Sequence, residues 1–112
     1  MNKIKHSPNS KNWRHSKEYR VWRILVIRRD KKCVICGSIK YRNVHHLNHA
    51  SYFKNQRFDV NNGITLCGKH HRLFHYLYIG NTRKKCTREQ FIKFLKILKE
   101  GENVIYDNLP IS

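Results

Sequence analysis

Two short metal-ligand motifs constrain the fold of this chain more than any other feature of its sequence. Cys33 and Cys36 are separated by two residues, and Cys67 and His70 repeat that spacing further along the chain. Two such pairs joined by a loop are how a chain builds a closed tetrahedral zinc site. The spacing therefore predicts a structural Zn²⁺ that holds two distant segments together.

The surroundings of the four cysteines support this interpretation. The first fifteen residues are polar and basic and contain no apolar stretch, so we expect no secretory signal and a cytoplasmic location. Cysteines in that compartment stay reduced, and thiols or metal ligands are expected there in place of disulfides. The alternative is a small reduced protein with incidental thiols, and the repeated spacing favours zinc.

The fourth zinc ligand is a choice between His70 and Cys86. A count of thiols favours Cys86, because all four cysteines would then share one site. The spacing favours His70, because ordering the long segment between Cys67 and Cys86 would carry an entropic cost that a nearby residue avoids. We therefore expect His70 at the zinc and a small packing role for Cys86.

The charge of the chain indicates a polyanionic partner. Its 112 residues include 24 Lys and Arg against 7 Asp and Glu, a net charge of +17. A membrane segment is not expected, because the longest uncharged apolar run covers only residues 24–27. So few acidic residues also argue against a catalyst built on paired carboxylates. Histidine and cysteine must then carry any chemistry.

The chain is organised as one domain preceded by a basic arm. Residues 1–15 are basic and lack periodicity, which predicts a mobile arm before a single domain over residues 16–112. Helices are expected over residues 16–30, which Ser16 would cap, over residues 68–78, with Gly80 and Asn81 as the stop, and over about residues 87–100. In the last helix Thr87 and Gln90 have capping-box spacing, and one apolar stripe is formed by Phe91, Phe94, Leu95 and Leu98. Short strands are expected at residues 42–47 and 64–66, with a loop over residues 48–62 between them. The zinc-stabilised core would cover residues 33–79.

A cluster of histidines predicts a second metal site. Six of the eight histidines lie between residues 45 and 75. On a helix, His71 and His75 are one turn apart and share a face, whereas His70 is turned by about 100°. His71 and His75, with His45 as a third ligand, would form an open site with room for water or a phosphate oxygen.

The order and spacing of these motifs resemble the HNH endonucleases, a family with a ββα-metal fold. The matching segments are Cys33–Gly37, Val44–Leu47, Asn61–Cys67 and Cys67–His75. The resemblance covers residues 16–79, and residues 81–82 and 87–91 are similar to small phage-encoded, free-standing members. It implies an α+β fold, with a ββα-metal (His-Me finger) core and a structural zinc between an N-terminal and a C-terminal helix. Residues 16–112 would be a single HNH nuclease domain.

The resemblance also implies a role for each matching residue. His46 takes the position of the general base, and Asn62 that of the residue that holds the loop and so orients the base. His45, His71 and His75 match the ligands of a catalytic divalent ion such as Mg²⁺ or Mn²⁺. The positions of the structural zinc ligands are taken by Cys33, Cys36, Cys67 and His70. The family more often has Cys where His70 stands, and His is itself a zinc ligand.

These observations predict a metal-dependent DNA endonuclease that hydrolyses phosphodiester bonds and leaves 5′-phosphate and 3′-hydroxyl ends, as the family does. Basic side chains would contact the DNA backbone. They are Lys17, Arg20, Arg23, Arg28, Arg29 and Arg72. The alternatives are a non-enzymatic zinc module that only binds nucleic acid and an RNA-binding or ribosome-associated zinc protein.

The biological role stays open among homing, phage packaging and restriction. A homodimer would cut both strands, whereas a monomer would nick one. Phage packaging proteins would be partners of a packaging-associated enzyme. In each case we expect the protein in the cytoplasm of a bacterial host infected by a phage.

Overall fold

A two-stranded antiparallel sheet lies at the centre of the computed structural model, which describes residues 12–79 and 86–101. Strand β1 (Asn43–His46) pairs with β2 (Gly63–Leu66), so that His45 lies opposite Ile64 and His46 opposite Gly63. Both strands were expected within one residue of these bounds. Together with the helices described below, they give the α+β class and the ββα arrangement that the sequence predicts.

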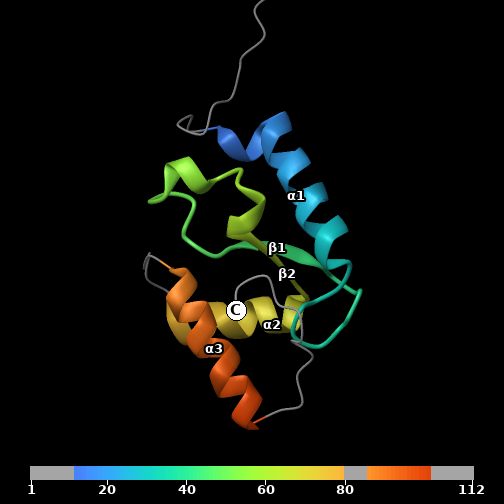
Figure 1. Cartoon of the computed structure of the whole chain (residues 1–112), viewed down its shortest axis with the longest axis vertical. Coiled ribbons are helices and arrows are strands. Elements are labelled where there is room, and N and C mark those ends of the chain that lie inside the picture. Colours follow the sequence, from blue (N-terminus) through green and yellow to red (C-terminus); the bar gives the residue numbers. More distant parts are fainter. Residues whose placement is uncertain (1–11, 80–85, 102–112) are drawn as a thin grey trace, which may run out of the picture.

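Helices cover both sides of this strand pair (Figure 1). Helix α1 (Lys17–Asp30) lies on one side, and α2 (Gly68–Phe74) and α3 (Arg88–Gly101) lie on the other. Short helical turns complete the described fold. They are η1 (Trp13–His15), η2 (Lys54–Gln56), η3 (Val60–Asn62) and η4 (His75–Ile79), the last of which is a π-helical turn that continues α2.

Ser16 begins α1 as the sequence predicts, and it also anchors the residues before the helix. Its hydroxyl accepts a hydrogen bond from the Tyr19 amide at 3.1 Å and donates one to the Trp13 carbonyl at 2.6 Å. The Trp13 side chain is only 3% exposed. Residues 12–15 therefore belong to the folded domain and not to the arm that we expected over residues 1–15. Residues 1–11 lie outside the described residues.

Arg29 and Asp30 join the end of α1 to β2. The Arg29 guanidinium donates to both oxygens of Asp30, at 2.7 and 3.0 Å, and to the carbonyls of Val60 and Gly63, at 2.9 and 2.6 Å. Asp30 in turn accepts a hydrogen bond from the Thr65 amide at 2.9 Å. Arg29, which the sequence suggested as a DNA contact, thus has its donors directed at the fold.

Helix α3 closes the main core with the apolar stripe that its sequence predicts. Phe91, Phe94, Leu95 and Leu98 are all buried, in a cluster with Ile64, Leu66 and Phe74. The predicted capping box is also confirmed. The Thr87 amide donates to the Gln90 side chain at 2.9 Å, and the Gln90 amide donates to the Thr87 hydroxyl at 3.3 Å.

Two details differ from the sequence expectations. The helix expected over residues 68–78 is α-helical only to Phe74, and its expected stop at Gly80 and Asn81 lies outside the described residues. The loop expected over residues 48–62 contains η2 and η3. Within residues 12–79 and 86–101, no helix has the length and apolar character that a membrane crossing requires.

Gly63 is required where α1 crosses β2. A Cβ atom at this position would lie 2.6 Å from Cγ2 of Val26 and 2.7 Å from Cζ2 of Trp22, both closer than van der Waals contact allows. Gly63→Ala should therefore destabilise the fold by about 1–3 kcal/mol, because it overpacks this contact. Chemical denaturation measures the change. Gly68→Ala is the matched control, since its nearest contact is the flexible end of Arg72, and it should change stability by less than about 0.5 kcal/mol. An equal loss in both variants would contradict the packing argument.

Candidate active site and structural metal site

The structure brings Cys33, Cys36, Cys67 and His70 together, with their ligand atoms all within 4.8 Å of one another. The Cys36 and Cys67 sulfurs are 3.7 Å apart, and Nδ1 of His70 lies 3.3 Å from the Cys67 sulfur and 3.9 Å from that of Cys33. Zinc–sulfur bonds of about 2.3 Å and zinc–nitrogen bonds of about 2.0 Å separate tetrahedral ligands by about 3.5–3.8 Å. The group therefore has the chemistry and the spacing that a structural zinc needs.

Local backbone structure presents these ligands. Cys33 and Cys36 lie on a tight turn, in which the Gly37 amide donates to the Cys33 carbonyl at 2.9 Å and Gly37 has a φ of 78°. Cys67 is the N-cap residue of α2, and His70 lies in its first turn. Burial acts to raise the pKa of the Cys67 thiol, but hydrogen bonds, among them one from the His70 amide, lower it overall. A lowered pKa favours the thiolate that zinc requires, whereas burial raises the pKa of the Cys33 thiol to about 11.

Cys86 lies apart from this group. Its thiol donates to the His46 carbonyl at 3.6 Å, and burial raises its pKa to about 11. A buried, protonated thiol of this kind is a small packing group. The structure thus places His70, and not Cys86, beside the three other cysteines.

A second group of possible ligands consists of His45, His71 and His75, whose ligand nitrogens are also within 4.8 Å of one another. They come from three elements: His45 from β1, His71 from α2 and His75 from η4. The ring centroids of His71 and His75 are 4.5 Å apart, and that of His45 lies 5.6 and 5.9 Å from them. Two histidines one helical turn apart and a third from β1 thus lie close together, as the sequence spacing predicts.

The environment of these three histidines suits a metal ion. Burial lowers the pKa of His45 far below its usual value, that of His71 to about 4, and that of His75 in the same direction. All three are therefore neutral at pH 7, the form that binds metal. In addition, Nε2 of His45 is buried and makes no hydrogen bond within the described residues. An orphaned buried nitrogen is costly, and a metal ion would satisfy it.

The three histidines face a pocket of about 330 Å³. His46 and His49 line the same pocket, as does Arg14, and no carboxylate among the described residues does. The sequence argument treats His49 as a surface or packing histidine and places Arg14 in the basic arm over residues 1–15. Only the folded chain brings them to the pocket.

His46 is held in one orientation on the opposite face of β1 from His45. Its ring stacks on Trp22, with centroids 4.0 Å apart and an interplanar angle of 11°. Nε2 of His46 lies 2.9 Å from the carbonyl oxygen of Arg57. A carbonyl can only accept a hydrogen bond, so Nε2 carries the proton and Nδ1 retains a free lone pair.

The basicity of His46 differs from the ordinary imidazole that the sequence argument assumed. Burial lowers its pKa to about 4, and the charge of Arg14 acts in the same direction, while the hydrogen bond to the Arg57 carbonyl opposes them. His46 is therefore neutral at pH 7, and it is a weaker base than free histidine.

Asn62 stabilises the loop that presents the Arg57 carbonyl to His46. Its buried side chain accepts a hydrogen bond from the Asn48 amide at 2.8 Å and donates to the carbonyls of Asn48 and Gln56 at 3.0 and 3.2 Å. The loop is thus closed on itself immediately before Arg57. Asn62 can orient His46 only through this loop, because no hydrogen bond joins the two side chains in the structure.

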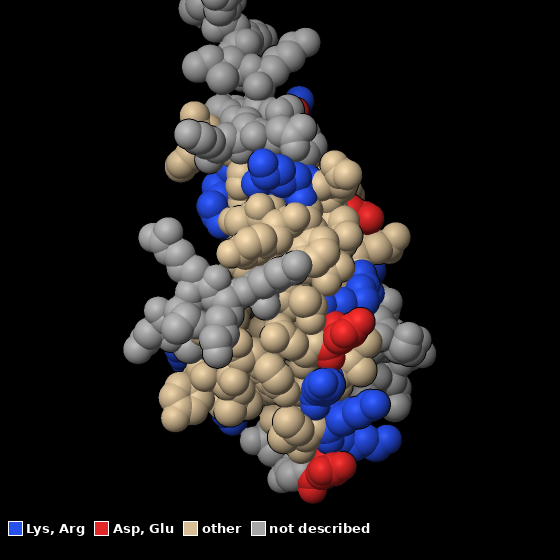
Figure 2. All heavy atoms as spheres, turned by 90° about the vertical axis from the view of Figure 1, so that its left-hand side faces the viewer, with Lys and Arg blue, Asp and Glu red and all other residues tan. Residues whose placement is uncertain are grey.

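Basic side chains lie outside both ligand groups. Figure 2 shows described Lys and Arg side chains toward the upper end of one face and along one lower edge, with fewer Asp and Glu. Lys17, Arg20 and Arg28 are exposed on α1, Arg23 is partly exposed there, and Arg72 is exposed on α2. Among the expected DNA contacts, Arg29 donates to the carbonyls of Val60 and Gly63, and Arg20 donates to the His15 carbonyl at 3.3 Å.

Comparison with known proteins identifies one family. Residues 33–80 match the model of a family described as HNH endonuclease. No curated protein and no solved structure matched the chain. The matched segment contains both ligand groups, together with His46 and Asn62.

His70→Ala should release tightly bound zinc and lower the melting temperature sharply, because a structural zinc contributes directly to folding free energy. Cys86→Ser, the control, should keep its zinc, since Cys86 lies outside the ligand group. Metal analysis after dialysis and thermal denaturation measure both effects. Zinc lost from Cys86→Ser and retained by His70→Ala would overturn the assignment.

His71→Ala and His75→Ala should each weaken the binding of a divalent cation at the histidine pocket and leave the tightly bound zinc in place. The reason is that these residues and His70 belong to different ligand groups. Calorimetric titration with Mn²⁺ measures the first effect, and metal analysis the second. Loss of zinc from either variant would count against two separate sites.

Proposed function

We propose that this protein is a metal-dependent DNA endonuclease, because residues 33–80 match the model of a family described as HNH endonuclease. It hydrolyses phosphodiester bonds and leaves 5′-phosphate and 3′-hydroxyl ends. The observation that carries the proposal is the composition of one pocket. Three neutral histidines suited to a metal ion and a fourth, separately oriented histidine line it, and its described lining residues include no carboxylate.

His45, His71 and His75 would hold the divalent cation. When bound, such an ion neutralises charge on the phosphate and helps the leaving oxygen to depart. Mg²⁺ and Mn²⁺ are the first candidates, although a set of three imidazoles also suits softer ions such as Zn²⁺. The buried Nε2 of His45 supports this assignment, because a metal ligand would satisfy it.

His46 is the general base in this proposal, and the atom that accepts the proton is Nδ1. The hydrogen bond from Nε2 to the Arg57 carbonyl selects the tautomer with a free lone pair at Nδ1. After Nδ1 takes a proton from the attacking water, Nε2 still donates to that carbonyl. A phosphate in the pocket would also offset the charge of Arg14 and so raise the basicity of His46.

Two further contacts hold this base in place. The stack on Trp22 limits rotation of the His46 ring, and Asn62 secures the loop that carries the accepting carbonyl. Asn62 is therefore a positioning residue in this mechanism. Such support lets the base meet its substrate without first having to reorganise.

The zinc group would support the active site through α2. Cys67 and His70 lie at the start of this helix, and His71 and His75 follow directly. By joining Cys33 and Cys36 to that point, a structural Zn²⁺ would set the position of the helix and of its two metal-binding histidines.

DNA is the proposed substrate, and the proposed backbone contacts are basic residues that are exposed or partly exposed. They are Lys17, Arg20, Arg23, Arg28 and Arg72. With one such histidine pocket among residues 12–79 and 86–101, a monomer would nick one strand, whereas a homodimer would cut both. Supercoiled plasmid separates these cases, because nicked and linear products migrate differently.

His46→Gln should reduce plasmid cleavage by at least about 10², because Gln can donate to the Arg57 carbonyl but cannot accept a proton from water. DNA affinity and zinc content should stay close to those of the wild type. Lys93→Gln is the control, since Lys93 is exposed on α3 and lies outside the histidine pocket, and it should cleave at the wild-type rate when DNA is saturating.

The assay is run with Mg²⁺ or Mn²⁺ and again with a chelator. Undiminished cleavage by His46→Gln would overturn the assignment of the base. A wild-type protein that binds DNA and does not cleave it with any divalent ion would instead be the non-enzymatic zinc module.

A further inference from the structure

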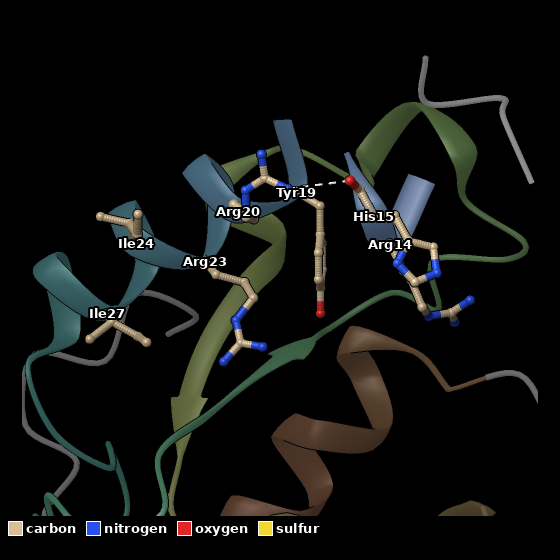
Figure 3. Close-up of a pocket in the computed structure, with 7 residues that line it drawn as sticks. All are labelled: Arg14, His15, Tyr19, Arg20, Arg23, Ile24 and Ile27. Carbon is tan, nitrogen blue, oxygen red and sulfur yellow. Dashed lines mark hydrogen bonds between the residues drawn. The ribbon is translucent and has the colours of Figure 1, made fainter. Parts of the chain in front are cut away.

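A second hollow, of about 620 Å³, lies along α1 next to the histidine pocket. Arg20 and Arg23 line it, together with Tyr19 and Ile27, and none of its lining residues within 12–79 and 86–101 is a carboxylate. In Figure 3 the side chains of Arg23 and Tyr19 extend in the same direction from α1, and Arg20 donates to the His15 carbonyl. The hollow thus combines cationic groups with an aromatic and an aliphatic surface, as a nucleotide strand requires.

Arg14 lines both hollows. It lies in η1, and its guanidinium carbon is 4.2 Å from the centroid of the Trp13 ring. That ring is buried and packs edge-to-face against His46, with centroids 5.5 Å apart. The bond from Ser16 to the Trp13 carbonyl ties η1 to α1. The backbone that carries Arg14 is therefore held beside the proposed base by the buried Trp13 ring and by the hydrogen bond from Ser16.

Among the described residues, no Asp or Glu lines either hollow beside Arg14. Arg14 is exposed, and it lines the histidine pocket as well as the hollow along α1. A cation placed where two such hollows meet is suited to an anionic ligand.

We propose that Arg14 binds the phosphate group that is hydrolysed and that the hollow along α1 receives the adjoining nucleotides of the same strand. The two hollows then form one path across the molecule, with Arg14 where they meet. This inference rests on the proposed function, since it names the contact that the substrate phosphate makes.

The chemistry of arginine fits this role. A guanidinium stacked on an aromatic ring keeps its edge N–H groups available, and those groups match two oxygens of one phosphate. Negative charge on the phosphate oxygens grows as water attacks. A cation already held in place therefore stabilises the transition state more than the bound substrate.

Arg14→Gln tests the proposal, with Arg14→Lys as the variant that keeps the charge and Lys93→Gln as the control. Lys93 is exposed on α3 and lines neither hollow. The single-turnover cleavage rate at saturating DNA should fall at least about 10-fold in Arg14→Gln and less in Arg14→Lys, because Lys keeps the charge but loses the two-point contact. Lys93→Gln should cleave at the wild-type rate.

A binding measurement with chelator present tests the same contact without catalysis. The slope of log DNA affinity against log salt concentration should become shallower in Arg14→Gln, by about the amount that one phosphate contact contributes. It should stay unchanged in Arg14→Lys and Lys93→Gln. Circular dichroism and zinc content establish that the variants are folded. An Arg14→Gln protein that matches Lys93→Gln in rate or in salt dependence would overturn the proposal.

These two measurements also separate this proposal from the proposed function. If the wild-type protein cleaves no DNA, the endonuclease function fails, while the salt dependence still shows whether Arg14 meets a phosphate. If the wild type cleaves and Arg14→Gln cleaves equally well, only the assignment of Arg14 fails.

Discussion

The alternation of side chains along β1 is the constraint on which the rest of the structure depends. It sends the neighbouring residues His45 and His46 to opposite faces of the sheet, and each face needs its own helix. On one face α2 and η4 supply His71 and His75 beside His45. On the other, α1 supplies Trp22 as a stacking surface for His46. One short strand thus gives the three-histidine group and His46, the proposed base, separate surroundings while both line a single pocket.

Burial then sets the electrostatics of that pocket. It lowers the pKa of every histidine that lines it, so that imidazoles in a chain of net charge +17 remain neutral. Neutral ligands do not cancel the charge of a divalent ion as carboxylates would. Since Arg14 lines the pocket and none of its described lining residues is acidic, a metal-bound pocket would be strongly positive. Such a potential favours a phosphate diester and raises its rate of association.

Much of this arrangement could be predicted from local patterns. The sequence predicts the capping box of α3 and its apolar stripe, because both depend on contacts within one helix. It also predicts the grouping of His70 with Cys67, which share one turn of α2. The separation of His70 from His71 and His75 follows from helical geometry alone. These features, with the order of the motifs, were enough to indicate the HNH endonuclease family.

Contacts between distant segments were decided only by the tertiary structure. Arg14 and Trp13 belong to the site because Trp13 is buried against His46, 33 positions later in the sequence. Arg29 is removed from the expected DNA contacts because its guanidinium donates hydrogen bonds to the carbonyls of Val60 and Gly63. The tautomer and lowered pKa of His46 depend likewise on the Arg57 carbonyl and on burial. Sequence spacing therefore determined which residues could bind metal, whereas burial and long-range hydrogen bonds, which no local pattern encodes, decided how each one is charged and oriented.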